Sequence, residues 1–280
     1  TEQTFELLDP VAVPVFHEPS DARHVTTKTR EYCEFLAIPE VLNGDSTSIV
    51  GTLGKGTEYL RSEMVPELIR EKLAWLPAEW EGRLSDFVTS WLLESAIFEA
   101  YIIQNVDSAA AREAHVTEAD LLTATEAAQH ALAAEKHLQS PVIYLEYSGT
   151  FGGEEAADIL AAMGEAVSWS RIWYGGGISS REDATAVLDA GADTVIVGNV
   201  FHDVASEEAD LVERATEALD DDPSAPAIRE WVDSAVDVEE TSAYRYLSTI
   251  PSVEKPARLA EDYLSKSIGL HLLLVERLEG

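Results

Sequence analysis

Two kinds of apolar pattern alternate along the chain, one with the spacing of strands and one with the spacing of helices. Six short runs are rich in β-branched and aromatic residues, as is typical of parallel strands buried on both faces. They are "VAVPVFHEP" (11–19), "CEFLAIP" (33–39), "AYIIQN" (100–105), "PVIYLEY" (141–147), "RIWYGGG" (171–177) and "DTVIVGNV" (193–200). Helical patterns lie between them, and this repeated order predicts a parallel sheet with helices packed outside it.

Three of the intervening segments have apolar residues at helical spacing. They are residues 117–138, 154–167 and 180–192. In the third segment, Ser180 precedes the apolar positions and has the side chain of a helix N-cap. We therefore expect a helix that begins just after Ser180.

The connection from residue 51 to residue 99 is much longer than a simple crossover, and its helical part contains Trp75, Trp80 and Trp91. Tryptophans on amphipathic helices commonly anchor a core or an interface, and we expect that role here. The functional alternative is an apolar wall for a long hydrocarbon substrate.

The C-terminal part of the chain has a different pattern. After Leu219 the acidic stretch "DDDPSAP" is typical of a linker, and residues 227–280 have a mostly helical pattern. The sequence therefore predicts a barrel domain over residues 1–219, followed by an acidic linker and helical extension over residues 220–280. We identify no candidate chemistry in this extension.

Charge is the strongest compositional signal. The 280 residues include 52 Asp and Glu against 19 Lys and Arg, which gives a formal net charge of −33. Such a balance repels nucleic acids and anionic membranes, so we expect no nucleic-acid partner. The acidic residues are spread along the chain and 46% of the residues are apolar. The charge therefore indicates a folded, halophilic surface, whose self-repulsion high salt would screen.

The sequence also bears on the compartment. No apolar run approaches the ~18 to 20 residues that a membrane helix requires, and the N-terminus lacks the basic-then-apolar order of a secretory signal. We therefore expect a cytoplasmic protein that is not an integral membrane protein. The single cysteine, Cys33, cannot form an internal disulfide and lies in an apolar run, so we expect a buried thiol rather than a nucleophile.

Glu146 interrupts one of the apolar runs. Because side chains alternate across a strand, Tyr144, Glu146 and Ser148 are expected on one face. Leu145 and Tyr147 are expected on the other. A carboxylate inside a barrel is costly unless it is paired or hydrogen-bonded, but at the carboxyl end of a barrel strand it faces the mouth where active sites form. We predict a catalytic or substrate-orienting role for Glu146; the structural alternative is a salt bridge at the rim.

Two glycine-rich turns follow later strands. The stretches "WYGGGISS" and "VIVGNVFHD" each lie between a strand and a helix, in successive units. Glycines in such turns let backbone N–H groups approach an anion, and the next helix adds the positive end of its dipole. Loops after the last two strands frequently form a phosphate site in (β/α)8 barrels. Together with "EYSG" before them, the two turns predict phosphate binding rather than simple turn geometry.

These stretches resemble a known family. "YLEYSGTFGG", "WYGGGISSREDA" and "ADTVIVGNVFHD", in this order and spacing, are similar to the geranylgeranylglyceryl phosphate synthases and their bacterial heptaprenyl relatives. The resemblance extends back through "AYIIQNVDSAAAREAHVTEAD" and "IPEVLNGDSTSIVGTLGK" to "VPVFHEPSD", and "EYSGT" and "EPSD" favour the archaeal group. It implies a TIM-type (β/α) barrel.

The resemblance also implies prenyl transfer. Members of the family join geranylgeranyl diphosphate, or a similar isoprenoid diphosphate, to the C3 hydroxyl of sn-glycerol 1-phosphate. This makes the first ether bond of archaeal membrane lipids, with Mg2+ on the diphosphate. By motif matching, the resemblance implies that Glu146 is the catalytic base and that Tyr144 assists it. It implies contacts to sn-glycerol 1-phosphate from Tyr144, Leu145, Glu146, Tyr147, Ser148, Gly149, Gly177, Gly198 and Asn199.

The chain also departs from the family pattern. Family members begin with a strand that carries Lys-x-Asp-Pro, whose Asp binds Mg2+, and a second strand that ends Gly-Gly-Ser or Gly-Gly-Thr. This chain has neither; in "ELLDP", Leu7 occupies the lysine position, so we interpret Asp9 as a turn residue. Six strands, and Thr1 in place of Met, indicate that an N-terminal portion is absent. We therefore expect a barrel without its first two strands, no identified metal ligands, and little transfer by this chain alone.

Two alternatives stay open from the sequence. One is another phosphate-binding barrel enzyme, such as an isomerase of amino-acid biosynthesis, because paired glycine-rich turns occur there too. The other is a non-catalytic or truncated paralogue of the same family. We also expect a homo-oligomer, but the sequence fixes neither its size nor the prenyl chain length.

Overall fold

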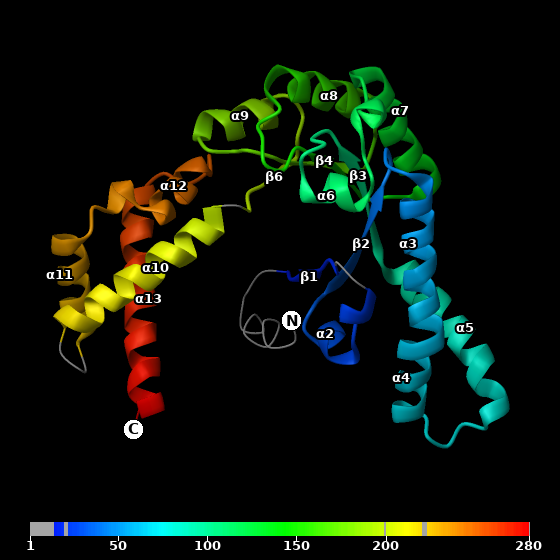
Figure 1. Ribbon diagram of the computed structural model, residues 1–280, viewed down its shortest axis with the longest axis horizontal. Helices are drawn as coiled ribbons and strands as arrows, with labels where there is room; N and C mark the ends of the chain where they lie inside the picture. The colour runs from blue at the N-terminus through cyan, green and yellow to red at the C-terminus, as the bar shows by residue number, and fades with distance from the viewer. Residues whose placement is uncertain (1–13, 20–21, 199, 220–222, 280) are drawn as a thin grey trace. The chain divides into compact units, whose positions relative to one another are not determined.

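The computed structural model describes residues 14–19, 22–198, 200–219 and 223–279 (Figure 1). The chain forms two compact units. The first comprises Thr1–Tyr174 and Gly191–Thr194, and the second comprises Gly175–Ala190 and Val195–Gly280. Each unit therefore joins segments that are not consecutive in the sequence.

Six strands form one sheet in the order of the chain. They are β1 (Phe16–His17), β2 (Phe35–Val41), β3 (Ile97–Ile103), β4 (Val142–Glu146), β5 (Arg171–Gly175) and β6 (Thr194–Ile196). The pairs β1–β2, β2–β3 and β3–β4 are parallel. Each run predicted as a strand overlaps one, although β2 ends two residues after its run and β3 begins three residues before its run. Residues 11–13 of the first run lie outside the described part of the chain. The α/β barrel-type class is confirmed, with six strands among the described residues where a complete barrel has eight.

The sheet is strongly curved. Phe16 on β1 and Trp173 on β5 have ring centroids 6.0 Å apart, although three strands lie between them in the sheet order. In a flat sheet, β1 and β5 would be about 19 Å apart, because neighbouring strands are ~4.8 Å apart. The curl therefore brings the inner sides of β1 and β5 into contact, as in the wall of a barrel.

The first unit also contains seven labelled helices within the described residues. They are α2 (Thr27–Glu31), α3 (Ser46–Tyr59), α4 (Val65–Lys72), α5 (Ala78–Ser95), α6 (Ala109–Glu113), α7 (Ala124–Ala133) and α8 (Gly153–Ala166). Short 3-10 turns lie at Ala22–His24 and Glu118–Asp120, and π turns lie at Leu60–Met64 and Ala134–Leu138. In Figure 1, α7 and α8 lie side by side above β3 and β4.

The helix expected over residues 154–167 is confirmed, whereas the one expected over residues 117–138 begins only at Ala124. A capping box made by Thr123 and Glu126 explains why the helix begins there. The N–H of Glu126 donates to Thr123 Oγ1 at 3.3 Å, and the N–H of Thr123 donates to Glu126 Oε2 at 2.9 Å. This capping box satisfies donors that the first helical turn leaves free, and so fixes the start of the helix.

The three tryptophans of the long connection are not core anchors in the described chain. Trp75, Trp80 and Trp91 keep 77%, 51% and 57% of their surface exposed. Aliphatic side chains of α5, including Leu84 and Val88, pack instead against the buried cluster under β2 and α4. The expectation of core burial was therefore wrong, because these aliphatic residues make the contact and leave the indole rings outside it. An interface role, and the alternative of an apolar wall for a hydrocarbon substrate, stay predictions.

Cys33 is buried, as expected. Its thiol donates to the carbonyl oxygen of Thr29 at 3.1 Å, and the Arg30 guanidinium lies 3.4 Å from the sulfur. The thiol is thus part of the packing between α2 and β2.

Helices make up almost all of the second unit. They are α9 (Arg181–Asp189), α10 (Val200–Ala218), α11 (Ala225–Ala235), α12 (Ser242–Thr249) and α13 (Pro256–Glu279), with a 3-10 turn at Val238–Glu240. Ser180 caps α9 as predicted, since its Oγ accepts the N–H of Asp183 at 3.1 Å. The expected helical C-terminal extension is confirmed by α11, α12 and α13. None of the described helices combines the length and the apolar character needed to cross a membrane.

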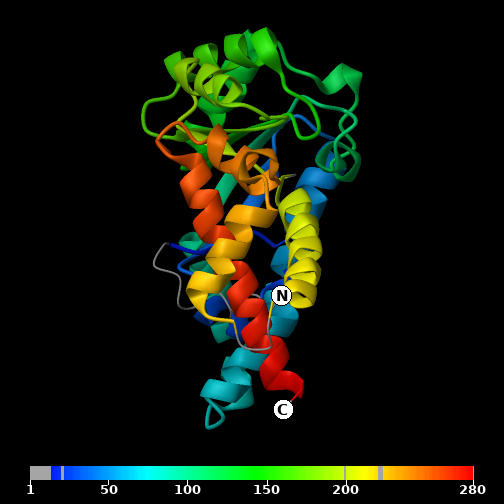
Figure 2. The ribbon, with the colours of Figure 1, turned by 90° about the vertical axis from the view of Figure 1, so that its left-hand side faces the viewer.

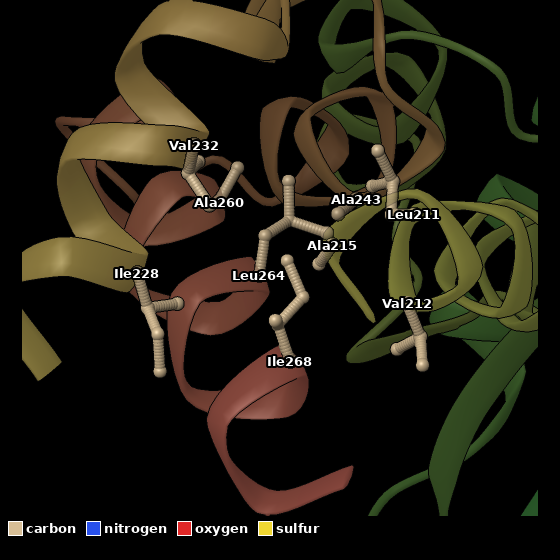
Figure 3. Close-up of a cluster of buried hydrophobic side chains, with 9 residues drawn as sticks. All are labelled: Leu211, Val212, Ala215, Ile228, Val232, Ala243, Ala260, Leu264 and Ile268. Carbon is tan, nitrogen blue, oxygen red and sulfur yellow. The ribbon is translucent and has the colours of Figure 1, made fainter. Parts of the chain in front are cut away.

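Helices α10 to α13 share one hydrophobic core (Figure 3). Its buried side chains are Leu211, Val212, Ala215, Ile228, Val232, Ala243, Ala260, Leu264 and Ile268. Figures 1 and 2 both show α10 lying against α13. The C-terminal extension is thus packed on α10 through apolar side chains from every one of its helices.

A buried carboxylate joins two loops of the first unit. Glu135, in the π turn after α7, is almost fully buried, and its Oε2 accepts the backbone N–H groups of Ser168, Trp169 and Ser170 at 2.7, 2.7 and 2.9 Å. Its Oε1 pairs with Lys136. Burial alone would raise the pKa of Glu135, but Lys136 and the three N–H donors outweigh it and lower the pKa to about 2.

We expect Glu135→Gln to lower the free energy of unfolding by about 1.5–3 kcal/mol at pH 7, the usual value of hydrogen bonds to a charged group. The native pKa lies below the ordinary value of 4.5. This stabilisation is therefore complete above pH 4.5 and is lost as the pH falls toward 2. Urea unfolding of both proteins from pH 7 to pH 3 checks this, with the exposed Glu165→Gln as control. A difference that does not narrow with falling pH would contradict the prediction.

Candidate functional site

Glu146 is the last residue of β4 and is only 4% exposed. Its Oε1 accepts the N–H of Ser148 at 3.3 Å, and its backbone oxygen accepts the N–H of Gln104 at 2.9 Å. The hydroxyl of Tyr144 donates to the same carboxylate, and burial together with the charge of Glu146 raises the pKa of Tyr144. Tyr144 and Glu146 thus share a face of the strand, as the alternation predicted.

Leu145 and Tyr147 point to the other side of β4. Leu145 is fully buried, and the Tyr147 hydroxyl donates to Glu155 Oε1 on α8 at 2.8 Å. The Tyr147 ring also stacks on Tyr174, with centroids 6.0 Å apart. Their side chains therefore belong to the packing under the helices, and a ligand beside Glu146 could contact these two residues only through their backbone.

The turn after β4 depends on a glycine and on an asparagine. Gly149 has φ of +89°, a conformation that L side chains rarely adopt. Asn105, just after β3, donates from Nδ2 to the carbonyl oxygen of Ser148 at 2.6 Å. Sequence reasoning did not assign Asn105 this role; its only signal was a polar residue at the end of an apolar run. Asn105 thereby fixes the backbone that follows Glu146.

A second acidic group lies on the inner face beside Glu146. Tyr101 pairs with Tyr144 across β3 and β4, and the two rings meet edge to face with centroids 4.6 Å apart. The hydroxyl of Tyr101 donates to Glu18 Oε1 at 2.8 Å. Glu18 is also hydrogen-bonded to Glu99, a neighbour of Tyr101 on the same face of β3. Sequence reasoning assigned no role to Glu18, Glu99 or Tyr101.

Glu99 is the buried member of this pair, with 3% of its surface exposed. Burial first, and then the charges of Glu18 and Glu146, raise the pKa of Glu99 to about 8. The acid is therefore protonated at neutral pH and donates to Glu18. Burial also raises the pKa of Glu18, and the charge of Glu146 adds to the shift. Among the described residues, Oε2 of Glu99 has no hydrogen-bond partner.

The two glycine-rich turns lie in the second unit. Gly177 precedes α9 with φ of +52°, and the carbonyl oxygen of Gly198 accepts the N–H of Phe201 at 3.0 Å where α10 begins. Gly149 belongs to the first unit, and Asn199 lies outside the described residues. The convergence of these four residues on one phosphate stays a prediction.

No candidate metal centre is found in the described part of the chain. Within residues 14–19, 22–198, 200–219 and 223–279, no three His, Cys, Asp or Glu side chains are arranged to hold a metal ion. Asp9, interpreted from the sequence as a turn residue, lies outside these ranges. The described carboxylates beside Glu146 are instead bound to tyrosines and to one another.

Comparison with known proteins places this geometry in a family. Residues 1–217 match the model of the PcrB family. The chain is 34% identical over 203 residues to heptaprenylglyceryl phosphate synthase of Listeria welshimeri, covering 72% of this chain and 74% of that protein. It is 31% identical over 207 residues to geranylgeranylglyceryl phosphate synthase of Haloquadratum walsbyi, covering 72% of each.

Shorter and more distant similarities are also found. Geranylgeranylglyceryl phosphate synthase of Methanospirillum hungatei is 41% identical over 111 residues, which cover 39% of this chain and 46% of that protein. The solved structure of wild-type GGGPS from Thermoplasma volcanium aligns with a TM-score of 0.47 at 19% identity, over 70% of this chain and 66% of that one. The family match spans more than half of the chain, and the longer alignments cover about three quarters of the relatives. The chain therefore belongs to the PcrB family.

Proposed function

We propose that this protein is a prenyltransferase that joins geranylgeranyl diphosphate, or a similar isoprenoid diphosphate, to the C3 hydroxyl of sn-glycerol 1-phosphate. The product would carry the first ether bond of an archaeal-type membrane lipid. The observation that carries the proposal is Glu146, a buried carboxylate at the carboxyl end of a strand, in a chain whose relatives are named prenylglyceryl phosphate synthases.

Glu146 has the surroundings that a general base needs. Tyr144 and the N–H of Ser148 orient its carboxylate. In the proposed step the C3 hydroxyl oxygen attacks the allylic carbon, and the bond from that carbon to the diphosphate breaks. The electron pair of this bond leaves with the diphosphate, and the hydroxyl proton passes to Glu146. Tyr144 holds the base in place during this transfer.

Backbone groups would hold the acceptor. The N–H of Ser148 is already bonded to Glu146, so the turn would offer the acceptor the N–H of Gly149, the residue with positive φ. Gly177 and Gly198, at the starts of α9 and α10, would bind the phosphate with helix N-termini behind them. Leu145 and Tyr147 would contribute through their backbone only, because their side chains face the helices.

Mg2+ is expected from the family resemblance, where it would neutralise charge on the diphosphate. The described residues do not supply a group fit to hold it. We therefore assign no ligands to the ion, and no step above is routed through it.

The function is tested by calorimetry and by single-turnover transfer with enzyme in excess. We expect sn-glycerol 1-phosphate to bind and, in the presence of Mg2+, to accept a prenyl group from geranylgeranyl or heptaprenyl diphosphate only slowly, in line with the little transfer expected from the sequence. Enzyme in excess makes such a slow transfer measurable. Binding of the acceptor without any transfer would indicate a non-catalytic relative. Turnover of small sugar phosphates, with no use of prenyl diphosphates, would indicate another phosphate-binding barrel enzyme.

Replacing Glu146 by Gln keeps the size of the side chain and removes the proton acceptor. General-base catalysis contributes about 10²–10⁴ in rate, so we expect single-turnover transfer to fall by about that factor. The affinity for sn-glycerol 1-phosphate, measured by calorimetry, should change little because backbone groups hold its phosphate. A rim salt-bridge residue would instead lose thermal stability and keep its transfer rate. A transfer rate near that of the unchanged protein would remove Glu146 from the mechanism.

Glu99 gives the protein a distinct pH dependence. Its folded-state pKa, about 8, exceeds the ordinary 4.5, so the folded chain holds a proton that the unfolded chain has released. The free energy of unfolding should therefore fall as the pH rises from about 4.5 to about 8 through this group. The glutamine of Glu99→Gln cannot ionise, so the free energy of unfolding of this variant should fall less between pH 4.5 and pH 8. Urea unfolding at pH 5, 6.5 and 8 measures it, with the exposed Glu113→Gln as control; parallel curves for all three proteins would contradict the shift.

A further inference from the structure

The C-terminal extension contacts both helices that follow the glycine-rich turns. α9 begins four residues after Gly177, and α10 begins two residues after Gly198. Helix α12 of the extension touches the first residues of both, and all of these elements belong to the second unit. The family match ends at residue 217, so α11, α12 and α13 lie beyond it.

Arg181 makes the contact on the α9 side. It is the first residue of that helix, and its guanidinium donates to three backbone carbonyl oxygens, one in the last turn of α12 and two in the loop that follows it. Nε donates to Ser248 at 3.1 Å, Nη1 to Pro251 at 2.7 Å and Nη2 to Val253 at 2.8 Å. The last carbonyls of a helix have no partner within it, and they form the negative end of its dipole. Arg181 thereby supplies donors to α12 and ties the start of α9 to it.

Two further contacts hold α12 on the α10 side. The ring of Phe201, the second residue of α10, lies 4.8 Å from the ring of Tyr246 between centroids. Glu207, two turns further along α10, accepts the N–H and the hydroxyl of Ser242 at 2.6 and 2.7 Å, and so caps the start of α12. α12 is therefore attached to α10 at two points and to α9 at one.

α12 has a rigid support of its own. Ala243 belongs to the buried cluster that also contains Leu211 of α10 and Leu264 and Ile268 of α13 (Figure 3). A buried core resists displacement because its side chains are close-packed. Movement of the start of α9 away from α12 would break three hydrogen bonds of Arg181 without moving this core.

We propose that the C-terminal extension is a brace that fixes the starts of α9 and α10, with Arg181 as the positioning residue for the phosphate-binding turn at Gly177. This inference rests on the proposed function, because it assigns the turn to the phosphate of the acceptor. A glycine with positive φ is conformationally free in the absence of support, and an ordered turn binds more tightly since the ligand need not order it. The three hydrogen bonds of Arg181 are directed to carbonyl oxygens, so its role is to position the turn rather than to bind the phosphate.

The test compares two arginines of the full chain. Arg181→Met removes the three hydrogen bonds and keeps the apolar stem. Arg214→Met is the matched control, because Arg214 also donates to a carbonyl of the extension, Ala235, at 2.8 Å, but from the far half of α10. Arg181→Lys keeps a charged donor and should restore part of the effect of Arg181→Met.

Hydrogen exchange of the backbone amides measures, without any ligand, whether Arg181 stabilises the start of α9. In Arg181→Met, we expect the amides of the first turn of α9, including Asp183 and Ala184, to exchange at least about tenfold faster. Arg214→Met should leave these amides unchanged while its own end of α10 becomes less protected. Unchanged protection of α9 in Arg181→Met, or equal loss in both variants, would overturn the proposal.

Calorimetry measures the affinity for sn-glycerol 1-phosphate and so tests the positioning role of Arg181. We expect the affinity to fall about tenfold in Arg181→Met, with single-turnover transfer at saturating acceptor changed by less than about twofold. Arg214→Met should bind as the unchanged protein does. Equal affinities for Arg181→Met and the unchanged protein would overturn the positioning role. If the unchanged protein binds no glycerol phosphate, the proposed function fails, and with it the phosphate role of Arg181; the exchange result then stands alone and decides whether the brace exists.

Discussion

The inner face of the first unit is governed by repulsion between carboxyl groups. Glu18, Glu99 and Glu146 interact electrostatically there, and three full charges in a partly dry space would destabilise the fold. Glu99 resolves the conflict by keeping its proton. Glu18 can then accept hydrogen bonds from both Glu99 and Tyr101, which hold its carboxylate in place.

This arrangement couples residues of β3 and β4 with Glu18, which directly follows β1. Tyr101 packs its ring against Tyr144, and Tyr144 donates to Glu146. The proposed base is therefore oriented by a tyrosine whose neighbour, Tyr101, is hydrogen-bonded to Glu18 on the same inner face. The proton on Glu99 lowers the total negative charge of Glu18, Glu99 and Glu146 by one. The strong curl of the sheet, seen in the contact of Phe16 with Trp173, is what brings β1 close enough to take part.

The sequence was sufficient for features that depend on neighbours along the chain. Strand alternation placed Tyr144 and Glu146 on one face, and the short polar side chain of Ser180 located the start of α9. It was not sufficient for features set by packing. Glu18 and Glu99 are 81 positions apart, and nothing in either local pattern indicates that they share a proton. The exposed Trp75 shows the same limit, because the packing of the helices, and not the local sequence, determines which side chains fill the core.

The hydrogen bonds of Arg181 to the C-terminal extension can form only late in the synthesis of the chain. Val253, the most distant partner of Arg181, is made 72 residues later. At ~5–20 residues per second, the ribosome needs about 4–14 s to add that length of chain. The strands of the first unit and α9 leave the ribosome well before α12 exists. The glycine-rich turn before α9 thus acquires the contacts of Arg181 only near the end of translation, and a chain that ends before α12 would lack them.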